Sequence, residues 1–174
     1  MSPGTERRPL CIVVMGVSGT GKTTVARLLA QRLGIPFAEA DDFHPPANIA
    51  KMSAGVPLDD ADRRPWLEAI GRRLRQADAA GIGCVVACSA LKRRYRDTLR
   101  AACPGVFFLH LTADHDLLAE RIGHRAGHFM PQALLGSQLA TLEPLGPDER
   151  GISLDAGPAP GLIAETAVAL LRQH

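Results

Sequence analysis

The sequence predicts an α/β fold in which a parallel sheet is covered by helices on both faces. Short apolar runs alternate along the chain with segments of helical period, and strands joined through helices form parallel sheets. The runs are continuously apolar, as expected for strands that are buried on both faces. We expect strands at residues 10–15, 36–40, 83–87 and 106–111 and a weaker one at 151–154.

Two of the intervening segments predict amphipathic helices. The first ends at Gly34 and gathers its apolar side chains on one face at positions i, i+3, i+4 and i+8, those of Val25, Leu28, Leu29 and Leu33. The second places Trp66, Ile70 and Leu74 on one side and turns its arginines outward. We expect the single tryptophan to pack in the core, because its large apolar ring gains most from burial.

Composition limits the kind of partner. The 174 residues fit one domain, and 20 basic against 18 acidic residues leave a formal net charge of +2, which is short of the basic balance of a nucleic-acid binder. The apolar runs are too short to span a membrane, and the N-terminal residues MSPGTERRPL lack the apolar segment of a secretory signal. We therefore expect one cytoplasmic domain over residues 1–174 that binds a small molecule, and neither nucleic acid nor membrane.

The cysteines predict no metal site. They lie mostly inside apolar runs rather than in the paired short spacings typical of zinc ligands. We expect reduced thiols that pack in the core, at Cys11, Cys84, Cys88 and Cys103.

A glycine-rich loop, GVSGTGKTT, lies between the first predicted strand and the first predicted helix. Its part GVSGTGKT matches the phosphate-loop pattern G-x-x-x-x-G-K-[ST] in full and in the required context. Glycines free the backbone amides to surround phosphate oxygens, and the helix N-terminus adds its own N–H groups. We expect this P-loop to bind a nucleoside triphosphate through Gly16, Val17, Ser18, Gly19, Thr20, Gly21, Lys22, Thr23 and Thr24.

Within the P-loop, two side chains have specific expected roles. Lys22 reaches the β and γ phosphates, and the hydroxyl of Thr23 holds Mg²⁺. The pattern alone does not say whether the phosphate goes to water, to a metabolite or nowhere.

Two carboxylates, Asp41 and Asp42, follow the second predicted strand at the same edge of the sheet as the P-loop. A carboxylate there can orient an alcohol and accept its proton as the bond to phosphorus forms. We expect Asp41 to be this base. Asp42 is the weaker candidate, or contacts Mg²⁺ through water. The alternative for each is to cap the following helix.

Four longer stretches carry a resemblance to a known family. They are GVSGTGKTT, DDFHPPANIAKMSAGVPLDDADRRPWL, CSALKRRYRDTLR and ERIGHRAGHFMPQALLGSQLATLEPL. Together, and in this order, they resemble gluconokinases of the small P-loop type. The pieces HPPAN, PWL, CSALK and LEPL are more specific than the phosphate loop. Thr20 and Thr23 stand where serine is frequent and keep the hydroxyl, and residues 151–174 are the least distinctive part.

The resemblance implies transfer of the γ-phosphoryl group of ATP, with Mg²⁺, to the 6-hydroxyl of D-gluconate, giving 6-phosphogluconate and ADP. It also implies a fold like that of shikimate and adenylate kinases, a P-loop NTPase three-layer sandwich with a five-stranded parallel sheet and a mobile lid, and a homodimer. Two rivals stay open. One is a kinase of the same build for another hydroxylated acid or a sugar, and the other is an ATP-binding switch that transfers nothing.

A gluconate acceptor makes two further residues candidates. His44 is expected to hydrogen-bond the polyol, or else to order the turn that follows it. Arg63 is expected to meet the gluconate carboxylate, because a guanidinium matches that geometry. Its alternative is a surface salt bridge with Asp59 or Asp60.

Two basic residues after the third predicted strand, Lys92 and Arg96, lie at i, i+4 spacing. They are candidates for binding substrate or phosphates, or they are simply solvated.

Two stretches exceed a minimal sheet-and-helix plan. We expect residues 43–64 to cover the substrate and residues 121–147 to form the lid. Arg121 and Arg125 share a helix face in the second stretch, with Arg121 expected at the nucleotide and Arg125 at the moving phosphoryl group. A closing arginine would neutralise charge there and help exclude water. The alternative is a pair of surface arginines.

Overall fold

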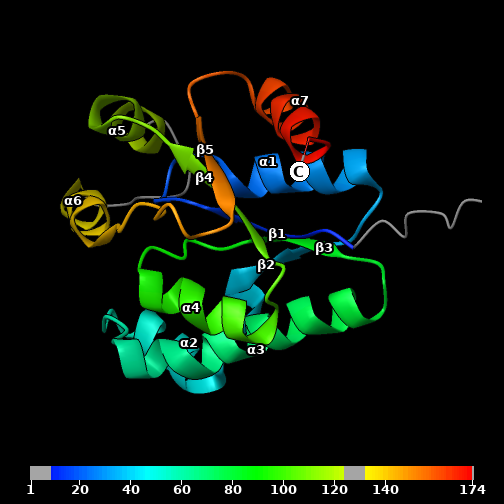
Figure 1. The fold of residues 1–174 in the computed structure, drawn as a ribbon. Helices are drawn as coiled ribbons and strands as arrows, with labels where there is room; N and C mark the ends of the chain where they lie inside the picture. The colour runs from blue at the N-terminus through cyan, green and yellow to red at the C-terminus, as the bar shows by residue number, and fades with distance from the viewer. Residues whose placement is uncertain (1–8, 124–131, 174) are drawn as a thin grey trace, which may run out of the picture.

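The computed structural model describes residues 9–123 and 132–173 and shows a parallel sheet between two layers of helices (Figure 1). The five strands have the order β2-β3-β1-β4-β5, and every pairing is parallel. Their bounds are β1 (Cys11–Met15), β2 (Phe37–Glu39), β3 (Cys84–Ala87), β4 (Phe107–Thr112) and β5 (Gly151–Asp155). The three-layer fold and the five strands expected from the sequence are confirmed.

Helices cover both faces of this sheet. α1 and α7 pack on one face, while α3 and α4 pack on the other (Figure 1). Their bounds, with those of the remaining elements, are α1 (Lys22–Leu33), η1 (a 3-10 turn, Ala40–Phe43), α2 (Pro46–Ser53), α3 (Asp60–Ala79), α4 (Arg93–Ala102), α5 (His115–Gly123), α6 (Gln132–Thr141) and α7 (Pro160–Leu171). Over residues 9–123 and 132–173, no helix is both long and apolar enough to cross a bilayer.

The central strand β1 explains why its sequence is apolar throughout. Ile12 and Val14 pack toward α1 and α7, whereas Val13 and Met15 pack toward α3 and α4, and all four are fully buried. A strand whose side chains pack into apolar cores on both faces of the sheet needs apolar residues at every position. Trp66 belongs to the second core as predicted, and its indole N–H donates to the carbonyl of Ala40 at 2.7 Å.

The carboxyl edge of the sheet is tightly built where β1 ends. Gly16 has φ +146°, and a Cβ atom there would stand 2.7 Å from the carbonyl oxygen of Leu111 in β4. Only glycine lets the chain turn so close to the neighbouring strand. A small apolar cluster packs α5 and α6 against this turn, formed by Val17, Leu91, Leu118 and Leu135.

Candidate active site

The P-loop runs from the end of β1 into the first turn of α1. Gly16, Gly19 and Gly21 all have positive φ, and Gly21 is the left-handed N-cap residue of α1. This backbone directs the loop amides and the helix N-terminus toward one place, where they can donate to phosphate oxygens. The loop expected from the sequence therefore has the conformation that phosphate binding needs.

Side chains of the loop are tied to its own backbone. Thr20, which is buried, donates its hydroxyl to the carbonyl of Val17 at 2.9 Å, and the ammonium of Lys22 donates to the same carbonyl at 3.1 Å. These bonds hold the loop in one shape. They also place the Lys22 charge at the concave side of the turn.

Glu39, at the end of β2, was missed by the sequence analysis. Its carboxylate accepts the hydroxyl hydrogen of Thr23, with 2.7 Å between Oγ1 and Oε2. Glu39 lies inside the strand predicted over residues 36–40. The Asp41–Asp42 pair just beyond it is the more evident catalytic candidate in the sequence. The available signal was its position as the last residue of a strand whose carboxyl end faces the P-loop.

Asp41 and Asp42 lie in η1, and both are exposed. Neither caps the following helix, because the N-cap residue of α2 is Pro45 and no side chain caps it. Burial raises the pKa of the Cys88 thiol, at the end of β3, to about 12, with Lys22 opposing this and Asp41 and Glu39 adding to it. The acids and the P-loop lysine therefore surround one strand end.

His44 stacks on Trp66, with 4.4 Å between ring centroids and 10° between the planes. Its Nδ1 lies 3.2 Å from the side-chain amide nitrogen of Asn48, in α2. Burial lowers the pKa of His44, and the charges of Asp41 and Arg63 also act on it in opposite directions. Two other residues predicted to bind substrate, Asp41 and Arg63, thus act on this imidazole.

Arg63 and Lys92 belong to one polar cluster between α3 and α4. The Arg63 guanidinium donates to the Tyr95 hydroxyl at 3.1 Å and lies over the Tyr95 ring. Tyr95 in turn donates to Asp60, whose carboxylate also pairs with Lys92 at 3.1 Å. The hydrogen bond from Tyr95, followed by that from Lys92, lowers the pKa of Asp60 to about 2. Arg63 is therefore linked to Asp60 through tyrosine rather than by a direct salt bridge.

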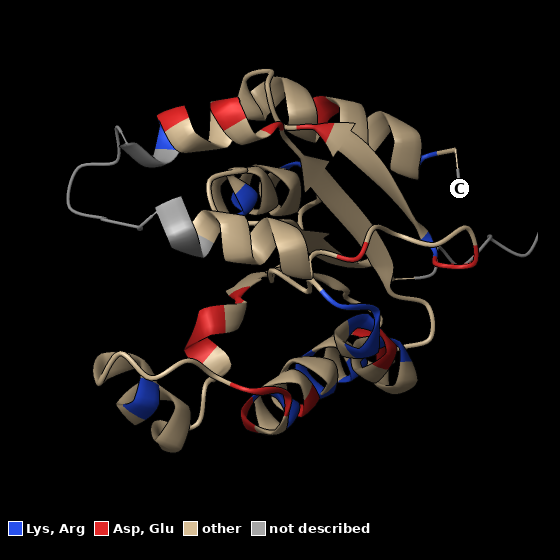
Figure 2. Ribbon diagram, turned by 90° about the vertical axis from the view of Figure 1, so that its left-hand side faces the viewer, with Lys and Arg blue, Asp and Glu red and all other residues tan. Residues whose placement is uncertain are grey.

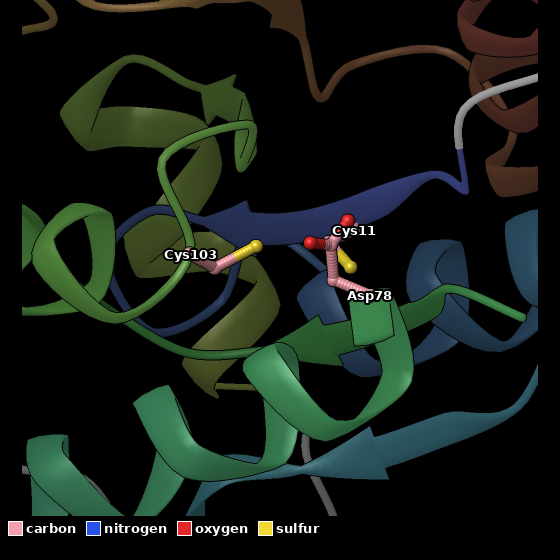
Figure 3. A group of neighbouring side chains, drawn as sticks. All are labelled: Cys11, Asp78 and Cys103. Carbon is pink, nitrogen blue, oxygen red and sulfur yellow. The ribbon is translucent and has the colours of Figure 1, made fainter. Parts of the chain in front are cut away.

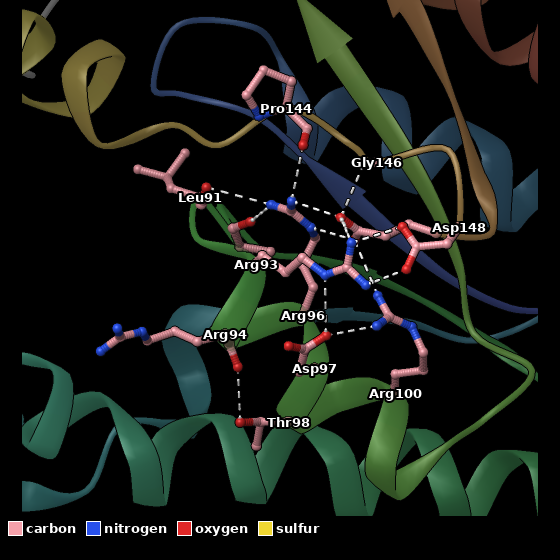
Figure 4. Close-up of polar contacts among 12 residues, drawn as sticks. Leu91, Arg93, Arg94, Arg96, Asp97, Thr98, Arg100, Pro144, Gly146 and Asp148 are labelled. Carbon is pink, nitrogen blue, oxygen red and sulfur yellow. Dashed lines mark hydrogen bonds and ion pairs between the residues drawn. The ribbon is translucent and has the colours of Figure 1, made fainter.

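Arg96 corrects one prediction. It is neither solvated nor directed at a ligand, because it is fully buried and pairs with the buried Glu149 at 2.7 Å (Figure 4). Its remaining N–H groups donate to the carbonyls of Ala90 and Pro144. A buried guanidinium whose N–H groups all donate to protein groups has no N–H group left to bind a substrate. Arg96 holds the chain after α6 against α4.

Around this buried pair lies a larger ion network. Arg100 also binds Glu149, and Arg93 binds Asp148 through both oxygens at the surface. Basic positions are frequent along α3 and α4 but are interleaved with acidic ones (Figure 2). The arginine-rich segment KRRYR is therefore largely neutralised within the fold.

Arg121, in the last turn of α5, contacts the P-loop. Its guanidinium donates to the carbonyl of Gly19 at 3.3 Å and to that of Ala156 at 2.6 Å. Both contacts border a cavity of about 310 Å³, whose lining also includes Thr20, Gly21 and Thr24 and residues of α7. This cavity extends from the P-loop toward α7.

Gln138, in α6, is a second residue that the sequence analysis missed. Its side-chain oxygen accepts a hydrogen bond from the backbone N–H of Ser18 at 2.8 Å, so α6 rests directly on the P-loop. Arg125, the predicted arginine of the lid, lies outside the described residues, as do residues 124–131 of the predicted lid.

The comparisons with known proteins agree with this geometry. The AAA domain family matches residues 11–145. Among solved structures, an unliganded sugar kinase from a Janibacter species has 50% identity and a TM-score of 0.87, covering 94% of this chain and 95% of that one. A gluconokinase from Sinorhizobium meliloti has 49% identity and a TM-score of 0.86, covering 96% and 94%. Fold and site define a P-loop kinase of a small molecule.

The curated relatives narrow this class. A gluconokinase from Gluconobacter oxydans is 52% identical over 161 residues, which cover 92% of this chain and 90% of that protein. The chain belongs to the gluconokinase family.

Proposed function

We propose that this chain transfers the γ-phosphoryl group of ATP to the 6-hydroxyl of D-gluconate. The observation that carries the proposal is a complete P-loop facing an acidic strand end, in a chain 52% identical to a gluconokinase. In the reaction, the bond between the γ-phosphorus and the β–γ bridging oxygen breaks, and a bond from the 6-oxygen of gluconate to phosphorus forms. The hydroxyl proton leaves to a base, and ADP and 6-phosphogluconate are released.

The nucleotide would be held by the loop amides, Lys22 and Arg121. The amides of the P-loop and of the first turn of α1 donate to phosphate oxygens, and the helix dipole favours their negative charge. Lys22 neutralises charge on the β and γ phosphates as the bond breaks. Arg121 already contacts the loop and the cavity beside it, which is the position expected for a residue that meets the rest of ATP.

Thr23 and Glu39 would hold Mg²⁺. Their side-chain oxygens lie 2.7 Å apart, and a hydroxyl beside a carboxylate is a donor set that fits this oxygen-seeking ion. When bound, the ion would offset the negative charge of the phosphates during transfer. Asp42 stays a candidate for a contact through water.

The acceptor would lie between η1 and α3. Asp41 is exposed at the end of β2, where it can orient the 6-hydroxyl and accept its proton. His44 offers its imidazole to the polyol. Arg63 would meet the carboxylate of gluconate, with its orientation fixed by Tyr95, and Lys92 stands beside it in the same cluster.

Closure would complete the site. We assign residues 43–64 to covering the substrate and residues 121–147 to a lid that brings Arg125 to the γ-phosphate. A kinase needs such a lid because water competes with the alcohol for the phosphoryl group. The hydrogen bond that Ser18 N–H donates to the Gln138 side chain would give this lid a fixed contact with the P-loop. We further propose that the protein acts as a cytoplasmic homodimer, which light scattering in solution would test.

The experiment is an acceptor panel. The protein is incubated with Mg·ATP and, separately, gluconate, shikimate, AMP or no acceptor, while ADP release is followed and the product is analysed by NMR. We expect ADP release only with gluconate and phosphorylation at its 6-position. ADP release with another acceptor would support a kinase for a different small molecule. Nucleotide binding without ADP release for any acceptor would support a switch.

A further inference from the structure

A second group of reactive side chains lies at the edge of the sheet opposite to the P-loop. One side-chain donor atom from each of Cys11, Asp78 and Cys103 lies within 4.8 Å of the others (Figure 3). Cys11 begins β1, Asp78 lies in the last turn of α3, and Cys103 follows the end of α4. Three elements that are distant in sequence thus bring two sulfurs and a carboxylate together.

Cys84 adds a third sulfur to this group. It is the register partner of Cys11 across β1 and β3, and the two thiols interact. Both thiols belong, with Cys103, to the core on the α3 and α4 face of the sheet. A thiol binds a metal ion as its thiolate.

The carboxylate of Asp78 occupies an unfavourable position without a cation. The C-terminal end of a helix carries partial negative charge, and the last turn of α3 contains no basic residue to offset it. Over residues 9–123 and 132–173, Asp78 forms no side-chain hydrogen bond or ion pair. Instead it acts electrostatically on the thiols of Cys11 and Cys103. A positive ion at this point would stabilise the helix end and the carboxylate together.

We propose that Cys11, Cys103 and Asp78, with Cys84 as the fourth donor, bind one thiophilic cation of the Zn²⁺ type. Zinc takes four ligands in a tetrahedron, with bonds of about 2.3 Å to sulfur and about 2.0–2.2 Å to carboxylate oxygen. Two sulfurs of such a site are then about 3.7 Å apart. The donor atoms of Cys11, Asp78 and Cys103 are already within 4.8 Å of one another and need shifts of only about 1 Å to reach this geometry. Cys84 lies outside this group and needs a larger shift to become the fourth donor.

The two proposed ion sites differ in ligand chemistry. Mg²⁺ selects oxygen ligands, as at Thr23 and Glu39, whereas thiolates select soft ions. Each thiol that binds the ion gives up its proton, so binding strengthens as pH rises. The thiophilic ion would join β1, β3, α3 and α4 and would stabilise the fold without entering the transfer reaction. This inference does not depend on the proposed function.

Cobalt(II) is a suitable probe, because tetrahedral thiolate–cobalt sites have intense visible absorption. The full chain, reduced and freed of metal, is titrated with Co²⁺ and then with Zn²⁺. We expect bands that saturate at one equivalent of Co²⁺ and are removed by Zn²⁺. We also expect Zn²⁺ to raise the Tm of the protein. An absence of thiolate–cobalt bands at excess Co²⁺ would overturn the proposal.

Variants locate the site. Asp78→Asn changes an exposed residue and should weaken Co²⁺ binding at least about tenfold, and Cys103→Ser should remove the bands. Two matched controls, Glu68→Gln on the exposed face of α3 and Cys88→Ala in the core, should bind Co²⁺ like the parent chain. If both Asp78→Asn and Cys103→Ser bind Co²⁺ as the parent does, the ion is held elsewhere and the assignment is wrong. Circular dichroism shows whether each variant is folded, and Asp78→Asn keeps the test decisive if Cys103→Ser is not.

Discussion

Two acids at the end of β2, Glu39 and Asp41, have different surroundings, and this separates their expected roles. Glu39 accepts a hydrogen bond from Thr23 in the P-loop, so it is committed to the phosphate side of the site. Asp41 is exposed in η1 and near His44, on the side where an acceptor would approach. The structure thus distinguishes a residue that would hold Mg²⁺ from one that would accept a proton.

Replacing Asp41 by asparagine tests this division. The amide keeps the shape of the side chain but cannot accept the proton, so we expect Asp41→Asn to lower kcat by about 10²- to 10⁴-fold. ATP affinity, measured by calorimetry, should be unchanged. Asp42→Asn is the comparison variant and should lose less activity than Asp41→Asn. A near-normal kcat for Asp41→Asn would remove the assignment of Asp41 as the base. A greater loss in Asp42→Asn would give that role to Asp42.

Arg96 and Glu149 make a second residue-level prediction, on stability. Breaking a buried ion pair leaves one charge without its partner, which costs about 3–5 kcal/mol. We expect Glu149→Gln to reduce the free energy of unfolding by this order, as measured with urea. Asp148→Asn removes the exposed partner of Arg93 instead, and it should change stability little. Equal effects of the two substitutions would contradict the role of burial.

The pH dependence of this pair has a defined sign. Burial raises the pKa of Glu149, but the hydrogen bond from Arg96 and further donors outweigh it and lower the pKa to about 2, from an ordinary value of 4.5. The folded state therefore holds the proton less tightly than the unfolded state. The stabilisation is complete above pH 4.5 and disappears as pH falls toward 2. The difference in unfolding free energy between the parent and Glu149→Gln should shrink over that range.

Arg96 also shows what a sequence pattern cannot supply. The segment KRRYR predicts basic residues on a helix, but whether one of them is buried depends on Glu149, which lies 53 positions away. Gln138 and Ser18 present the same difficulty at a separation of 120 positions. The P-loop was predictable because its function depends on adjacent residues, whereas these contacts depend on the packing of distant ones.

At the level of elements, η1 and α2 are joined to α3 by one aromatic stack. His44 precedes α2 and lies on Trp66, which is buried in α3. The segment expected to cover the substrate, residues 43–64, therefore contacts through His44 the only tryptophan of the chain, Trp66 of α3. Fluorescence from this residue should report changes in the segment.

We expect the Trp66 fluorescence to fall as His44 is protonated, because a stacked imidazolium quenches indole. Since burial lowers the pKa of His44, the midpoint should lie below the ordinary value of 6.5. His44→Phe keeps a ring at the position and should abolish the titration, while Asn48→Ala should leave a titration with a shifted midpoint. Gluconate that binds His44 should move the midpoint of the parent chain. A titration that persists unchanged in His44→Phe would exclude this histidine as its source.

At the scale of the whole molecule, the alternation of strands and helices predicts only part of the sheet topology. The five strands and their parallel direction follow from apolar runs separated by helices. The position of β3 between β1 and β2 is not encoded in any single segment, because it depends on which strand each connecting helix returns to. The resemblance to a family supplied the P-loop kinase type of this α/β fold, which periodicity alone left open.

Ligand binding should be visible in the stability of the whole chain. A ligand that binds only the folded state at 100 times its Kd adds about 2.7 kcal/mol to the free energy of unfolding. We expect Mg·ATP at saturating concentration to raise the Tm of the parent chain. Lys22→Ala should reduce this shift, whereas Arg64→Ala, an exposed position on α3, should retain it. A Tm that does not respond to Mg·ATP in the parent chain would contradict nucleotide binding at the P-loop.

The strand order has one more consequence. Because β3 is inserted between β1 and β2, the ends of β1 and β2 stand two strand spacings apart, roughly 9.5 Å at about 4.7–4.9 Å each. The P-loop, which follows β1, and the acid proposed to accept the proton, which follows β2, are therefore separated by the end of β3. The strand order would thus set how far the acceptor alcohol lies from the loop that holds the nucleotide.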